Sequence, residues 1–375
     1  MEPVGMTGLE SIVYVVHDLD RSRHFYIEKL DFAEVGRSTP ELEEAEGQRT
    51  VVFSAGECRV ICVKPLRDDS WAARWMLKHP DGVAELRFGV EDADRALALL
   101  ESRGATPIED VRRESGIAHF AITTPFQITW RFVERGPDSA PLYPGIALTE
   151  HVPTHNRIGF GQFDHITSNF ETLSPALLWM QHVMGFERYW DITFHTIDID
   201  PTRESGSGLK SVVMWDPHSG VKFANNEPLR PHFEDSQINL FIEDLRANGV
   251  QHAAMTVSDI LPAVTQLRER GISFMPTPAA YYDMLPQRIR DVGIMRIDED
   301  IEDLRRLEIL IDGKEEHSYL LQIFMQESAG LYGEREAGPF FYEVIQRKGD
   351  RGFGGGNFRA LFESIERLQR SAGRV

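Results

Sequence analysis

Pro339-Phe340-Phe341-Tyr342-Glu343-Val344-Ile345-Gln346-Arg347 is the stretch from which the rest of the chain can be interpreted. Its aromatic and β-branched residues predict a strand, and a carboxylate in so apolar a run is costly to bury unless something such as a metal ion pairs with it. The glycine-rich segment Gly352–Asn357 follows, too rich in glycine for a regular element. Apolar residues then recur at helical spacing, at Phe358, Leu361, Phe362, Ile365 and Leu368. We therefore predict a flexible joint and a C-terminal helix that acts as a lid over a site marked by Glu343.

Length and charge exclude several classes of protein. A chain of 375 residues with 42% hydrophobic residues is long enough for two or more domains with sizeable cores. A net charge of −19 argues against nucleic acid or an anionic membrane as a partner. We expect no secretory signal and no membrane span, because the chain shows neither a basic start followed by an apolar run nor a long apolar stretch.

The two cysteines indicate the redox state of the compartment in which the protein works. Cys58 and Cys62 share one face of a predicted strand, where they stand too far apart for a comfortable disulfide. We therefore expect buried thiols in a reducing cytoplasm.

A unit of strand, helix and further strands recurs along the chain. In the first half, strands are predicted at 11–16, 51–53, 59–63, 82–90, 118–123 and 127–134, with helices at 18–30 and 92–103. In the second half, strands are predicted at 163–169, 210–215, 222–226, 250–257, 319–326 and 340–347, with helices at 173–184 and 259–270. Residues 136–160 are proline-rich and weakly periodic, as expected of a linker. We predict an α+β fold with an N-terminal domain 1–135, a linker 136–160 and a C-terminal domain 161–375, each domain containing two such modules.

The two halves can be laid on each other, and three positions then stand out. The segments that match are Leu9-Glu10-Ser11-Ile12 with Phe163-Asp164-His165-Ile166, Val83-Ala84-Glu85-Leu86 with Val250-Gln251-His252-Ala253, and Thr129-Trp130-Arg131 with Phe341-Tyr342-Glu343. His165, His252 and Glu343 of the second half thus correspond to Ser11, Glu85 and Arg131 of the first. We infer a catalytic C-terminal domain and an N-terminal domain that kept the fold without metal ligands.

Two imidazoles and one carboxylate are the ligands that hold Fe(II) on one face of an octahedron and leave positions open for substrate and dioxygen. The separations, 252 − 165 = 87 and 343 − 252 = 91, place each ligand on a different strand. A curved sheet can turn all three side chains inward at one level. Any one of the thirteen histidines, taken alone, is more often a surface or core side chain than a ligand. The matched place in the repeat is what distinguishes His165 and His252.

Longer motifs carry a resemblance to a known family. They are Gln251-His252, Tyr281-Tyr282-Asp283, Leu320-Leu321-Gln322-Ile323-Phe324, Phe340 to Arg347, and Gly352-Phe353-Gly354-Gly355-Gly356-Asn357-Phe358. Together they resemble the 4-hydroxyphenylpyruvate dioxygenases of the vicinal oxygen chelate superfamily, whose βαβββ modules form half-barrels. The resemblance implies that His165, His252 and Glu343 bind Fe(II). It also implies that an aromatic 2-oxo acid and O2 are converted to homogentisate and CO2 in tyrosine and phenylalanine catabolism.

The resemblance also implies which residues contact the substrate. The polar ones are Ser211, Asn226, Gln237, Gln322 and Asn357, and the aromatic ones are Phe324, Phe341, Phe353 and Phe358. Without the resemblance, each phenylalanine would be read as core packing, and Asn226 and Gln237 equally well as turn or strand-end residues. Ala224 stands where the family usually has proline, and Met325 where threonine is common. Neither departure touches the three proposed ligands.

Two other functions stay open at this point. One is 4-hydroxymandelate synthase, which uses the same substrate and iron but hydroxylates the benzylic carbon. The other is a non-enzymatic oxygen-chelate protein that sequesters a small molecule. Gly356-Asn357-Phe358 follows the dioxygenase pattern. We expect a homo-oligomer, a dimer or a tetramer.

Overall fold

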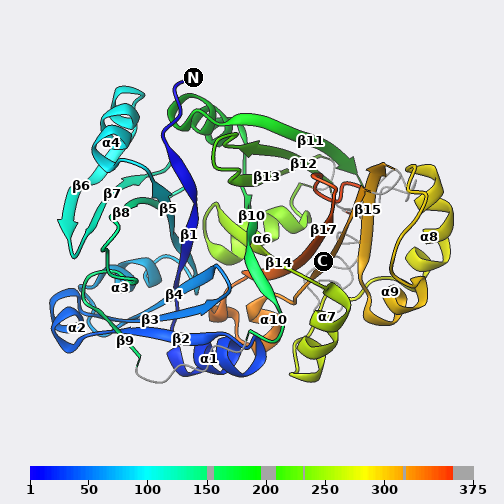
Figure 1. Cartoon of the computed structure of the whole chain (residues 1–375), viewed down its shortest axis with the longest axis horizontal. Coiled ribbons are helices and arrows are strands. Elements are labelled where there is room, and N and C mark those ends of the chain that lie inside the picture. The colour runs from blue at the N-terminus through cyan, green and yellow to red at the C-terminus, as the bar shows by residue number, and fades with distance from the viewer. Residues whose placement is uncertain (150–155, 196–207, 231–232, 316–317, 358–375) are drawn as a thin grey trace.

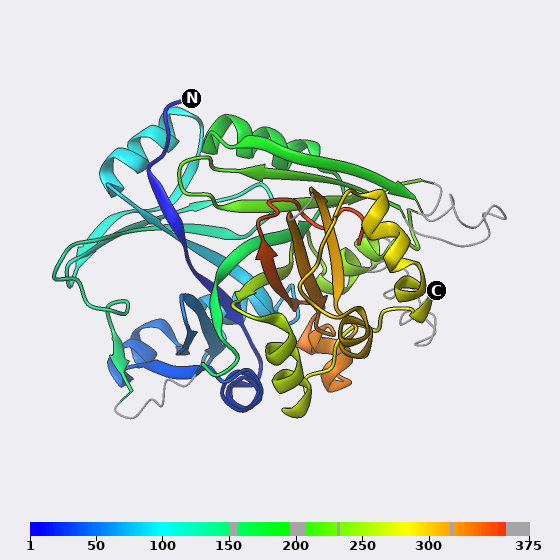
Figure 2. The same ribbon diagram turned by 45° about the vertical axis from the view of Figure 1, so that its right-hand side comes forward.

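Two curled β-sheets, one from each half of the chain, lie side by side (Figure 1, Figure 2). The computed structural model describes residues 1–149, 156–195, 208–230, 233–315 and 318–357. The first sheet has the order β6-β7-β8-β5-β1-β4-β3-β2-β9 and the second β11-β12-β13-β10-β14-β17-β16-β15. The strands of the first sheet are β1 (Met6–Val15), β2 (Ala33–Ser38), β3 (Gln48–Ala55), β4 (Cys58–Pro65), β5 (Gly82–Val90), β6 (Thr106–Glu114), β7 (Ile117–Thr123), β8 (Thr129–Arg135) and β9 (Ile146–Leu148). Those of the second sheet are β10 (Phe160–Asn169), β11 (Glu187–His195), β12 (Gly208–Trp215), β13 (Lys222–Pro228), β14 (Gly249–Val257), β15 (Leu310–Glu315), β16 (Ser318–Phe324) and β17 (Phe341–Lys348).

All four modules share one strand order. In each, the first strand pairs in parallel with the last, as in β1 with β4, β5 with β8, β10 with β13 and β14 with β17. The first strands of the two modules of each half then pair antiparallel, β1 with β5 and β10 with β14. The predicted α+β fold of paired βαβββ modules is confirmed.

The helices after the first strands begin at the same kind of residue in three of the modules. Asp18, Asp92 and Asp259 each accept backbone N–H groups of the first turn, which satisfies donors that have no partner inside the helix. The helices are α1 (Leu19–Arg23) with η1 (His24–Lys29), α2 (Pro40–Glu46), α3 (Trp71–Met76), α4 (Ala93–Ser102), α5 (Ser174–Trp179) with η2 (Met180–Met184), α6 (Gln237–Leu245), α7 (Ile260–Glu269), α8 (Ala279–Asp291), α9 (Ile301–Leu307), α10 (Ser328–Tyr332) and the short η4 (Arg335–Ala337). Among the described residues, no helix is long and apolar enough to cross a bilayer.

The two halves share one hydrophobic core. Trp130 on β8 is fully buried, its ring stacks on Phe223 of β13 at 5.0 Å, and it meets Trp179 of α5 edge-on at 5.1 Å. Tyr26 and Tyr342 join the halves again through a 2.8 Å hydrogen bond between their hydroxyl groups. Each sheet therefore buries part of its apolar surface against the other.

Several elements were not expected from the sequence. The second strand of every module, β2, β6, β11 and β15, was missed, as were helices α2, α3, α6, α8 and α10. The predicted linker 136–160 contains β9, which pairs with β2 and lengthens the first sheet. Cys58 and Cys62 are both buried and free, as predicted.

Candidate metal centre

Strand register brings the three proposed ligands to one face of the second sheet. His165 on β10 lies opposite Ala254 on β14, and Ala254 lies opposite Glu343 on β17. His252 precedes Ala254 by two residues, so its side chain leaves the sheet on the same face. Ala254 contributes only a methyl group to this row, and the space above it is left for the longer side chains on either side.

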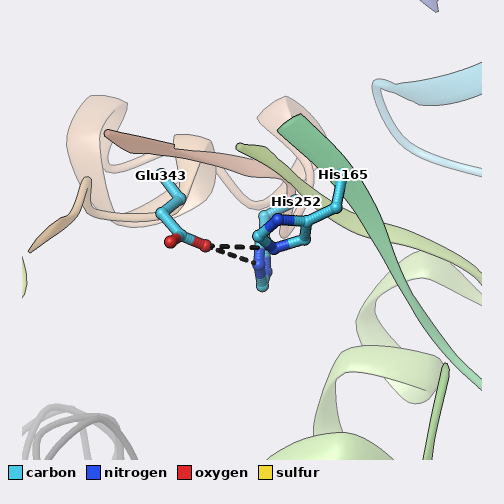
Figure 3. A group of neighbouring side chains, drawn as sticks. All are labelled: His165, His252 and Glu343. Carbon is cyan, nitrogen blue, oxygen red and sulfur yellow. Dashed lines mark ion pairs between the residues drawn. The ribbon is translucent and has the colours of Figure 1, made fainter. Parts of the chain in front are cut away.

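The three side chains converge on one point. Nε2 of His165 and Nε2 of His252 each lie 3.3 Å from the same carboxylate oxygen, Oε2 of Glu343 (Figure 3). All three residues are buried, and their ligand atoms lie within 4.8 Å of one another. In the described part of the chain, no other group of His, Cys, Asp and Glu has this arrangement.

Neighbouring acceptors orient both imidazoles. Asp164 Oδ1 lies 2.8 Å from Nδ1 of His165, and the amide oxygen of Gln251 lies 3.1 Å from Nδ1 of His252. An acceptor at Nδ1 selects the tautomer with its proton there, which leaves the Nε2 lone pair free for a metal ion. The residue directly before each histidine in the sequence thus fixes the orientation of its imidazole ring.

Burial and charge act in opposite directions on these groups. Burial would raise the pKa of Glu343, but the two imidazoles lower it. Burial lowers the pKa of His252 below its ordinary value, whereas for His165 the carboxylates of Glu343 and Asp164 outweigh burial and raise the pKa. Burial would raise the pKa of Asp164, but hydrogen bonds from Arg347 and His165 hold it far below its usual range.

The donor set fits a divalent metal ion. Ligands bound about 2.1 Å from one ion at right angles lie about 3.0 Å apart, close to the two 3.3 Å separations. The other carboxylate oxygen of Glu343, Oε1, is buried and has no hydrogen-bond partner among the described residues. An unpaired buried carboxylate oxygen is costly, and a bound cation relieves that cost.

A pocket opens over the three ligands. Five residues predicted to contact a substrate line it: Asn226, Gln237, Gln322, Phe324 and Phe353. Helix α6 packs against β10, β13 and β14, which brings Gln237 in its first turn to the cavity.

The other predicted residues lie just outside the lining. The ring of Phe341 stacks on that of His252, with centroids 4.9 Å apart. Ser211 is buried on β12 opposite Asn226. Asn357 is buried and accepts hydrogen bonds from Arg288 and Tyr281, at 2.9 and 2.8 Å. Phe358 and the predicted lid helix lie outside the described residues.

Sequence reasoning missed some residues of the site. Thr167, Ile238, Gln251 and Gly354 also line the cavity. Thr167 and Gln251 carried a usable signal, because one follows His165 by two residues on the same strand face and the other directly precedes His252. Ile238 and Gly354 gave none, since a helix start and a loop fix their positions.

The equivalent place in the first sheet is filled by an ion-pair cluster. The register is the same, with Ser11 opposite Arg87 and Arg87 opposite Arg131. Arg131 binds both carboxylate oxygens of Glu85, at 3.1 and 3.2 Å, and also contacts Glu109 at 2.7 Å. Burial would raise the pKa of Glu85, but Arg131 and Arg87 lower it to about 2. Guanidinium groups thus occupy the space that the second half leaves for a metal ion.

Comparison with known proteins agrees with this geometry. The model of the Glyoxalase/Bleomycin resistance protein/Dioxygenase superfamily matches residues 8–132 and 162–291. A 4-hydroxyphenylpyruvate dioxygenase from Caenorhabditis briggsae is 35% identical over 321 residues, which cover 83% of this chain and 78% of the relative. The enzyme of the same name from Dictyostelium discoideum is 31% identical over 99% of this chain and 100% of its own.

A solved structure extends the comparison to the fold. A mutant of 4-hydroxymandelate synthase from Streptomyces coelicolor superposes with a TM-score of 0.78 at 26% identity, covering 97% of this chain and 99% of that one. Sequence and structure agree end to end, so the chain belongs to the 4-hydroxyphenylpyruvate dioxygenase family of the vicinal oxygen chelate superfamily.

Proposed function

We propose that the protein is an Fe(II)-dependent dioxygenase that converts 4-hydroxyphenylpyruvate and O2 to homogentisate and CO2. The observation that carries the proposal is the convergence of two imidazole nitrogens and one carboxylate oxygen in a buried cavity, in a chain of this family. His165, His252 and Glu343 would hold the ion. When bound, Fe(II) activates dioxygen and offers open positions to the carboxylate and ketone oxygens of a 2-oxo acid.

The chain's own residues bind and orient the substrate. Asn226, Gln237 and Gln322 bring amide groups to the cavity, which can hydrogen-bond a phenol without adding charge. Phe324 and Phe353 provide apolar walls that hold an aromatic ring and exclude water. The amide oxygen of Asn226 is buried without a partner among the described residues, so it remains free to accept from a ligand.

We also propose domain boundaries at 1–135, 136–160 and 161–375, a lid formed by the C-terminal helix, a cytoplasmic location and a homo-oligomeric state.

Two experiments separate this function from its alternatives. The protein is loaded with Fe(II) under anaerobic conditions and then mixed with 4-hydroxyphenylpyruvate and O2. It should consume O2, and chromatography should identify homogentisate as the product. The superposition on a hydroxymandelate synthase mutant keeps 4-hydroxymandelate as the second candidate. Absence of iron-dependent O2 uptake would instead indicate a non-enzymatic binding protein.

Phe358 is expected to decide between the two products. In the resembled dioxygenases the residue at this place is a phenylalanine that faces the substrate ring, and in the hydroxymandelate synthases it is a smaller aliphatic residue. A small displacement of the ring is enough to change which carbon is attacked. Phe358→Ile should therefore yield some 4-hydroxymandelate beside homogentisate, measured as a product ratio. A variant that is slower but still makes homogentisate alone would show that Phe358 serves only in packing.

Gly354 is expected to set the position of Gln322. A Cβ at Gly354 would lie 2.5 Å from the amide nitrogen of Gln322, and the backbone has φ +65°. Gly354→Ala should displace the amide and raise KM for 4-hydroxyphenylpyruvate by about 10-fold, the loss of one hydrogen bond. Gly349→Ala is the matched control, because Gly349 has φ +85° but its Cβ would meet nothing nearer than 3.5 Å. Equal effects in both variants would attribute the loss to backbone strain.

A further inference from the structure

A buried ion pair stands behind one of the proposed metal ligands. Arg347 on β17 donates Nε to Asp164 Oδ2 and one terminal nitrogen to Asp164 Oδ1, both at 2.6 Å. The side chain of Asp164 is 5% exposed and that of Arg347 is 17% exposed. A two-pronged contact between a guanidinium and a carboxylate fixes both groups in orientation as well as distance.

The same guanidinium also holds the loop that follows β17. Its other terminal nitrogen donates to the backbone carbonyls of Asp350 at 3.1 Å and Gly352 at 2.7 Å. Its carbon lies 5.7 Å from the centre of the Phe353 ring, and that ring meets His165 edge-on at 5.0 Å. Arg347 therefore contacts the acceptor that orients His165 and the loop that carries Phe353 and Gly354 into the cavity wall.

We propose that Asp164 and Arg347 are positioning residues that couple the orientation of His165 to the position of the loop Asp350–Asn357. Neither residue touches the cavity itself. Asp164 acts through Nδ1 of His165, and Arg347 acts through Asp164. This inference rests on the proposed function, since it assumes that His165 is a metal ligand.

The far end of the loop is held independently of Arg347. The backbone N–H of Gly356 donates to Asp312 at 2.9 Å, and Asn357 accepts from Arg288 at 2.9 Å. Because its far end is fixed, the loop can be displaced by a shift of Arg347 mainly at residues 350–354. These are the loop residues nearest His165. By reciprocity of coupled equilibria, metal binding at His165 should then reduce the motion of this part of the loop.

The test uses the full chain with Fe(II) alone as the probe under anaerobic conditions. Asp164→Asn keeps an acceptor for His165 but removes the negative charge. Arg347→Lys keeps the positive charge but cannot make the two-pronged contact with Asp164. Each should weaken Fe(II) binding about 10- to 100-fold, as changes to the partners of metal ligands do. Hydrogen exchange of a peptide covering residues 350–354 should slow on saturation with Fe(II) in the native protein and should not respond in either variant.

Two controls make the outcome unambiguous. Arg268→Lys disrupts a half-buried contact to Glu308 (2.7 Å) that lies outside the cavity lining, and it should change neither readout. His165→Ala tests the assumption beneath the inference, because full Fe(II) affinity in that variant would refute the metal site itself. If His165→Ala loses Fe(II) while Arg347→Lys keeps native affinity and native exchange protection, the metal site stands and the coupling is refuted.

Discussion

His165→Ala, His252→Ala and Glu343→Ala should each remove bound Fe(II) and bring turnover below detection while the fold stays intact. Each side chain supplies one of three converging ligand atoms, and two remaining ligands hold a divalent ion poorly. The affinity for Fe(II) should fall by more than about 100-fold. That is the largest loss usually seen when a residue that hydrogen-bonds a metal ligand is replaced. Iron content after gel filtration, O2 uptake and circular dichroism are the measurements.

Histidines away from the cavity are the controls for this series. His182 is exposed on η2, and His182→Ala should bind Fe(II) and turn over like the native protein. His151, His155, His195 and His232 are expected to be dispensable as well, although their side chains lie outside those that the structure describes. Full iron content and activity in His165→Ala would show that the ligand set is wrong.

Trp130→Ala should have the largest effect on stability. Its indole is fully buried between the halves and contacts five aromatic rings, those of Phe88, Phe126, Trp179, Phe186 and Phe223. Truncating such a side chain removes buried area and leaves a cavity, which costs about 3–5 kcal/mol of unfolding free energy. Because the core is shared, unfolding in denaturant should remain a single transition at a lower midpoint.

The matched control for this prediction is Trp71→Ala. Trp71 lies at the start of α3 and is only half-buried, so its removal should cost much less. A split of the Trp130→Ala transition into two steps, with one step at the native midpoint, would show that the halves are stable independently.

The first and last strands of the modules could be predicted because they lie inside the sheets. β14 and β17 are buried over most of their length, so apolar and β-branched residues dominate them. The second strand of each module lies at or next to a sheet edge. β6 has no buried residue at all, and an exposed edge strand carries no hydrophobic alternation from which it could be recognised.

The metal ligands could be predicted because the chain repeats itself, whereas their surroundings could not. Asp164 and Arg347 are 183 residues apart, and only the parallel and antiparallel pairing of β10, β14 and β17 brings them together. The glycine run was interpreted as a flexible joint. A Cβ at Gly354 or Gly355 would lie 2.5 Å from Gln322 or 2.8 Å from Trp190, so these glycines also serve close packing, which sequence alone does not reveal.

The ion-pair cluster of the first sheet bears on how the two halves diverged. A histidine in place of Glu85 would leave Arg131 and Arg87 buried without their shared carboxylate, at a cost of about 3–5 kcal/mol. A carboxylate in place of Arg131 would instead add a third acidic group beside Glu85 and Glu109 and leave Arg87 as the cation paired with Glu85. Either change at Glu85 or Arg131 toward a metal ligand therefore passes through a less stable protein, so selection against misfolding opposes the conversion of this half into a second metal site.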